Sequence, residues 1–93
     1  EPGQIQSAAE LYSPESGRVL EVLTTQPGVQ IYTGNWLEGC PEGKDGHIYH
    51  DYDGVAIECQ HYPDSPNEPS YPTTVLRPGE VFEQAIIFAF SVR

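Results

Sequence analysis

Residues 16–35 read SGRVLEVLTTQPGVQIYTGN and carry the clearest strand signals in the chain. β-branched and other apolar residues lie on both sides of Gln26-Pro27-Gly28, which is a turn signal. Alternation along the second half of the stretch places Gln30 and Tyr32 on one face and Val29 on the other. The stretch therefore predicts two consecutive β-strands, the second of which presents a polar amide on one face.

The same signals recur along the rest of the chain, so the sequence predicts an all-β protein. Short runs of β-branched and aromatic residues are separated by turns that contain Pro or Gly. The nine Pro and nine Gly residues interrupt the chain too often for a long helix. We expect strands near residues 6–12, 18–25, 28–33, 54–60 and 81–92, and long loops at 34–52 and 62–74.

The last expected strand, residues 81–92, is the most hydrophobic and contains the continuous apolar run AIIFAF at residues 85–90. An apolar run without polar alternation is typical of a strand that is covered on both faces. We therefore expect this strand to lie inside a sheet, with more partner strands than residues 1–93 supply.

The charge balance excludes two classes of partner. Fourteen acidic residues against four basic ones give a formal net charge of −10. Nucleic acids and anionic membranes both need a surface rich in Lys and Arg, so we expect neither to bind this chain. No segment approaches the roughly 18–20 apolar residues of a membrane span, and the first residues lack the basic and apolar regions of a signal peptide.

The two cysteines, Cys40 and Cys59, are too few for a disulfide framework. We expect two free thiols, as is typical of cytoplasmic proteins. The chain also lacks an Asn-x-Ser/Thr glycosylation signal. The sequence therefore predicts a cytoplasmic location.

Three blocks of sequence point to one known family. The first is residues 16–35, the second is Glu58-Cys59-Gln60 followed by PDSPN at residues 63–67, and the third is VLRPGE at residues 75–80. In this order and spacing they resemble the galactose mutarotase (aldose 1-epimerase) family, and the resemblance spans residues 11–93. It implies that residues 1–93 are the C-terminal segment of a single aldose 1-epimerase domain, part of a galactose-mutarotase-like β-supersandwich whose upstream segments are absent.

The resemblance also implies an activity. Members of this family interconvert the α and β anomers of galactose and glucose by acid/base ring opening, without a metal or cofactor. The family's glutamate base falls on Glu58, and its substrate-contacting glutamine falls on Gln30. The family's histidine acid belongs to an earlier segment. The missing N-terminal part of the same protein is therefore an expected partner, and the isolated chain is expected to be inactive.

Taken without the resemblance, Glu58 has a simpler interpretation as a surface glutamate on a half-buried strand. A carboxylate at a strand end can also be partly desolvated, which raises its pKa toward a value useful for a general base. Cys59 would then point to the opposite face and pack in the core. Two other functions stay open, namely a non-catalytic sugar-binding module and a structural protein that keeps the fold without a sugar site.

Other chemistry-bearing residues suggest weaker hypotheses. His47 and His50 lie three residues apart, but no third ligand completes a recognised pattern, so we expect no metal site. His61 follows Glu58 by three residues, yet it matches neither histidine of the family. Trp36 could stack on a sugar, although packing of its loop onto the sandwich is the favoured interpretation.

Overall fold

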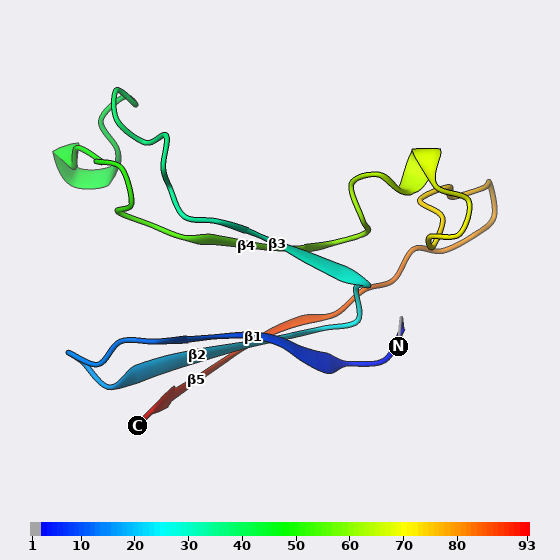
Figure 1. The fold of residues 1–93 in the computed structure, drawn as a ribbon, viewed down its shortest axis with the longest axis horizontal. Helices are drawn as coiled ribbons and strands as arrows, with labels where there is room; N and C mark the ends of the chain where they lie inside the picture. The colour runs from blue at the N-terminus through cyan, green and yellow to red at the C-terminus, as the bar shows by residue number, and fades with distance from the viewer. Residues whose placement is uncertain (1–2) are drawn as a thin grey trace.

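The computed structural model describes residues 3–93, which form five antiparallel strands in two sheets (Figure 1). The strands are β1 (Gln6–Tyr12), β2 (Arg18–Thr24), β3 (Gly28–Tyr32), β4 (Ala56–Gln60) and β5 (Ile86–Val92). Two short 3-10 helices, η1 (Lys44–Gly46) and η2 (Ser65–Asn67), lie in the long loops, and residues 3–93 contain no α-helix. The predicted all-β class is confirmed, and β1 to β4 match the expected strands to within two residues.

The small hydrophobic core lies on β2, the central strand of the three-stranded sheet β1-β2-β5. This strand pairs with a neighbour on each side, which favours its β-branched side chains. Val19 and Val22 are the buried hydrophobic side chains of the described residues, and Val22 is completely buried. The turn that leads into β2 contains Gly17 at φ +76°, a conformation that L side chains rarely adopt.

The turn Gln26-Pro27-Gly28 carries the chain out of the first sheet and into β3. The Thr24 hydroxyl accepts a hydrogen bond from the Gln26 N–H at 3.0 Å and donates one to the Ala85 carbonyl at 3.1 Å. β3 then pairs with β4 alone, as a two-stranded ribbon. Figure 1 shows the two sheets as separate layers that are joined near this turn.

The expectation for residues 81–92 is wrong about where the strand begins. The strand begins only at Ile86. The preceding residue, Ala85, lies beyond the end of β2, where it accepts a hydrogen bond from the Thr25 N–H and donates one to the Thr25 hydroxyl. Among residues 3–93, β5 lies at the edge of its sheet with β2 as its one partner, and Phe88 and Phe90 are 53% and 76% exposed, as expected of a strand that needs more partners than residues 1–93 supply. The reason is that the chain leaves this sheet after β2, so the described residues offer no further strand to pair with the outer edge of β5.

The chain is extended for its length. Its radius of gyration is 16.7 Å, whereas a compact domain of this length would have about 12 Å. Large apolar side chains such as Ile31, Val81 and Val92 are exposed. Because exposed apolar surface of this extent marks sites of further packing, the two sheets present faces that are suited to being covered.

Polar contacts organise the long loop between β3 and β4. The His50 Nδ1 lies 2.9 Å from the Glu38 Oε1. The Glu38 N–H donates to the Asp51 carboxylate at 2.8 Å, and the His50 N–H donates to the Asp53 carboxylate at 2.8 Å. The hydrogen bond to Glu38, and then the negative charge of Glu38, raise the pKa of His50 above its ordinary value.

Candidate active site

The two site residues predicted from the sequence lie directly opposite each other. In the antiparallel register of β3 and β4, Gln30 pairs with Glu58. Directly opposed residues share one face of a sheet and have their Cβ atoms about 4.5–5.5 Å apart. Both residues are exposed, so the amide and the carboxylate are open to one small ligand at the same time.

The face of the ribbon that carries Gln30 and Glu58 is called the polar face here. Tyr32 lies on the same face of β3, as alternation along the sequence predicts. Val29 and Cys59 pair with each other on the opposite face. Cys59 therefore points away from Glu58, as expected. It is a free thiol and only half-buried, so residues 3–93 enclose it in part.

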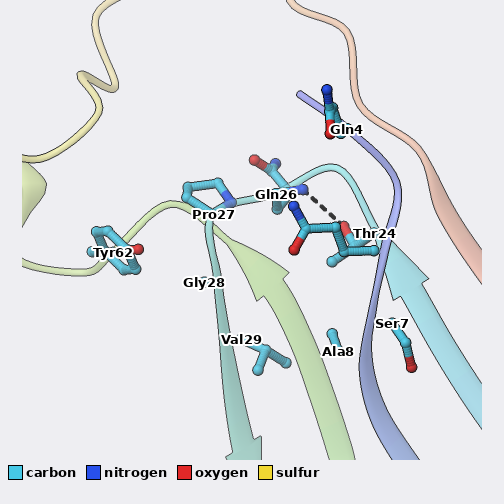
Figure 2. Close-up of a pocket in the computed structure, with 10 residues that line it drawn as sticks. Gln4, Ser7, Ala8, Thr24, Gln26, Pro27, Gly28, Val29 and Tyr62 are labelled. Atoms are coloured by element: carbon cyan, nitrogen blue, oxygen red, sulfur yellow. Dashed lines mark hydrogen bonds between the residues drawn. The ribbon is translucent and has the colours of Figure 1, made fainter. Parts of the chain in front are cut away.

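One end of the polar face is bounded by the ring of Tyr62. A Cβ at Gly28 would lie 2.9 Å from the Cδ1 and 3.0 Å from the Cε1 of this ring, so any larger residue would force the ring to move. Figure 2 shows the ring beside Gly28 and Pro27. The hollow drawn in that view has a volume of about 310 Å³. It is lined by Tyr62, by the start of β3 and by residues from β1, β2 and the segments next to them, but not by the Gln30–Glu58 pair.

A second hollow lies beside Gln30. It has a volume of about 530 Å³ and is lined by Gln30 of β3 and, from the loop after β4, by Tyr62, Pro63, Asp64 and Tyr71. Sequence reasoning assigned no role to these loop residues. The only available signal was the block PDSPN at residues 63–67, which contributes to the family resemblance without indicating a function.

The arrangement can bind a polyhydroxylated ligand and accept a proton from it. The Gln30 amide both donates and accepts hydrogen bonds, whereas an ionised Glu58 carboxylate only accepts. The desolvation expected for Glu58 is not provided by residues 3–93, because this residue is exposed. Within residues 3–93, β4 pairs with β3 alone and Glu58 stays exposed, so the strand end is open here.

The remaining sequence candidates lie outside this constellation. Trp36 is 80% exposed, so the expectation that it packs its loop onto the sandwich is wrong. Its loop extends away from the sheets in Figure 1, and the Trp36 N–H donates to the Tyr32 hydroxyl at 3.1 Å. The His61 ring lies 6.4 Å from that of Phe82, measured between centroids. Within residues 3–93, no three or more His, Cys, Asp or Glu side chains are placed to share a metal ion.

Comparison with known proteins identifies the family. The profile described as aldose 1-epimerase matches residues 3–89. The chain is 53% identical over 77 residues to the galactose mutarotase of Mus musculus, covering 83% of this chain and 22% of that protein. It is 50% identical over 84 residues to the galactose mutarotase of Homo sapiens, covering 90% and 25%. It is 39% identical over 85 residues to the aldose 1-epimerase of Escherichia coli (strain K12), covering 89% and 24%.

The all-β fold and these matches agree, and the chain belongs to the aldose 1-epimerase family. The names of these relatives describe isomerases that act on sugars. The chain spans about a quarter of the length of the curated relatives it matches. In the described part of the chain, no helix has the length and apolar character needed to cross a membrane.

Proposed function

We propose that the protein to which these residues belong interconverts the α and β anomers of a free hexose, galactose or glucose, and that this chain supplies the base. The observation that carries the proposal is the direct pairing of Gln30 with Glu58 in a chain of the aldose 1-epimerase family. In this reaction Glu58 accepts the proton of the C1 hydroxyl. Gln30 holds the sugar next to the carboxylate.

The proposed reaction opens the sugar ring and closes it again. As Glu58 takes the proton from the C1 hydroxyl, the bond between C1 and the ring oxygen breaks, and its electron pair goes to the ring oxygen. An acid protonates that oxygen, the aldehyde end rotates about the C1–C2 bond, and the reverse steps give the other anomer. We assign the acid to a part of the domain outside residues 1–93, since no histidine of residues 3–93 lines the hollow beside Gln30.

The exposure of Glu58 supports this division of the site between two parts of one domain. A general base works best when its pKa lies near the operating pH, and desolvation is one way to raise a carboxylate pKa. The part of the domain that supplies the acid would also cover the polar face and so desolvate Glu58. The free thiols of Cys40 and Cys59 support the further proposal of a cytoplasmic location.

Polarimetry of freshly dissolved α-galactose with the complete protein tests the assignment. Glu58→Gln should lower kcat by about 10²–10⁴-fold, the usual contribution of a general base, because the amide keeps the shape but cannot accept a proton. Galactose affinity should stay within a few-fold. Gln30→Ala should instead raise KM more than it lowers kcat, because it removes a contact made in the ground state and the transition state alike.

The exposed Glu15, in the turn before β2, offers a matched control outside the polar face. Glu15→Gln removes the same charge and should leave both kinetic constants unchanged. A Glu58→Gln enzyme with near-normal kcat would mean that the base lies elsewhere. Binding of galactose by the wild-type protein without interconversion would instead select a non-catalytic sugar-binding function, and absence of any hexose binding would select a structural one.

A further inference from the structure

The hollow beside Gln30 has the composition of a sugar-binding wall. Tyr62 and Tyr71 meet edge to face with ring centroids 4.9 Å apart, and they are 37% and 40% exposed. Each ring therefore keeps part of its apolar surface open to a ligand. Asp64 adds one carboxylate to the same hollow. Aromatic surface with a few placed polar groups is typical of small-molecule sites.

The hollow borders the proposed reaction centre, because Gln30 is one of the residues that line it. Gly28 and Gln30 are successive positions on one face of β3, so their Cα atoms lie about 6.6–6.8 Å apart. The Tyr62 ring lies against Gly28, which is one such step from the pair formed by Gln30 and Glu58. A hexose with its C1 hydroxyl at Glu58 can therefore extend its other end along β3 to this ring.

Asp64 is held in a defined orientation. The Asn67 side chain donates from Nδ2 to the Asp64 Oδ1 at 2.9 Å, and the Asn67 N–H donates to the Asp64 carbonyl at 2.9 Å. The second carboxylate oxygen, Oδ2, has no hydrogen-bond partner within residues 3–93, and it can accept a bond from a ligand hydroxyl. An acceptor that is already oriented loses little freedom when the ligand binds.

We propose that Tyr62, Tyr71 and Asp64 bind the end of the hexose that is remote from C1, and that they determine which hexoses the enzyme accepts. The proposal rests on the epimerase function proposed above. The two rings pack against the apolar C–H surface of the sugar, and the Asp64 Oδ2 accepts a hydrogen bond from a hydroxyl at that end. These residues transfer no proton, so substituting them should change KM and the affinity for the sugar rather than kcat.

Kinetics of galactose interconversion by the complete enzyme, with galactose affinity from calorimetry, test the proposal. Asp64→Asn keeps the Oδ1 that bonds Asn67 but replaces Oδ2 with an amide nitrogen. It should raise KM and the dissociation constant at least about tenfold, the loss expected for a hydrogen bond to a charged group, with kcat within about twofold. Glu68→Gln removes the same charge from the same loop outside the hollow, and it should change neither constant.

Variants at the ring separate a binding role from a structural one. Tyr62→Ala should raise KM about as much as Asp64→Asn, whereas Tyr62→Phe should keep the parent KM because the ring remains. Gly28→Ala should behave like Tyr62→Ala, because its Cβ would displace the ring. With 4-deoxygalactose and 6-deoxygalactose as substrates, the penalty of Asp64→Asn should disappear for the sugar that lacks the hydroxyl bound by Asp64.

Failure of this proposal is distinguishable from failure of the proposed function. Parent KM values for Asp64→Asn and Tyr62→Ala, in an enzyme that Glu58→Gln inactivates, would overturn the binding wall and leave the epimerase function intact. Lowered stability without a change in KM would also overturn it, because the hollow would then be filled by another part of the protein. A wild-type protein that does not interconvert the anomers would overturn both.

Discussion

Replacing Gly34 with alanine should destabilise the base of the long loop between β3 and β4, because two independent constraints require glycine there. Its φ is +74°, in the left-handed region. A Cβ at this position would lie 2.7 Å from the Gly54 carbonyl oxygen and 3.0 Å from the Cδ1 of Leu37. The Gly34 carbonyl also accepts a hydrogen bond from the Tyr52 N–H at 2.8 Å, so a shift of this backbone would disturb the loop closure.

The magnitude follows from these two constraints. An L residue in the left-handed region costs about 1–2 kcal/mol relative to glycine. Forcing a Cβ against a backbone oxygen is a form of overpacking and adds about 1–3 kcal/mol. Gly34→Ala should therefore lower the free energy of unfolding by about 2–5 kcal/mol. Gly39 provides the matched control, since it has φ +85° with nothing within 4 Å of its Cβ, and Gly39→Ala should cost only the first amount.

Urea denaturation of the complete protein, followed by circular dichroism, measures both variants. The difference between their free energies of unfolding isolates the steric contacts with Gly54 and Leu37, because both variants share the unfavourable φ. Equal losses for Gly34→Ala and Gly39→Ala would refute the steric part of the reasoning. A Gly34→Ala protein as stable as the wild type would mean that residue 34 does not have the left-handed φ of +74°.

Two further predictions concern the loop and β4. The hydrogen bond to Glu38 raises the pKa of His50, so the charged pair should stabilise the loop below about pH 6.5 and lose this contribution as the pH rises through the raised value. An NMR titration should show a lower His50 pKa in Glu38→Gln, and an unchanged value would contradict the pairing. Cys40 and Cys59 are free, so both should be alkylated without reductant, the exposed Cys40 faster; a pair left unlabelled in mass spectrometry would contradict this.

The positions of β1 to β4 were predictable because their signals are local. Each strand carries its own β-branched or aromatic residues, and each turn carries its own Pro or Gly. Alternation alone predicted the face on which Gln30 lies. The role of Glu58 could not be predicted in this way, because a glutamate near a strand end has no local property that separates a base from a surface residue. Its assignment depended on the family resemblance.

The environment of β5 and the loop contacts were not predictable from local signals. The apolar run at residues 85–90 predicts a covered strand, but partner strands determine coverage, and β5 has only β2 as a partner among residues 3–93. The hollow beside Gln30 brings together Tyr62 and Tyr71, which lie in a loop without periodicity. Nothing in their spacing indicates that the two rings meet, because the path of the loop between them decides the contact.

The position of Glu58 on the polar face depends on the register between β3 and β4, and no tight turn fixes that register because a long loop joins the strands. A slip of one residue would move Glu58 to the opposite face. Contacts at both ends of the ribbon oppose such a slip. The Tyr52 N–H bonds the Gly34 carbonyl at one end, and the Tyr62 ring lies against Gly28 at the other. Both glycines occupy positions where a Cβ would clash with a neighbour, with Gly54 and Leu37 at Gly34 and with the Tyr62 ring at Gly28, so substituting either one should weaken the contacts that favour the observed register.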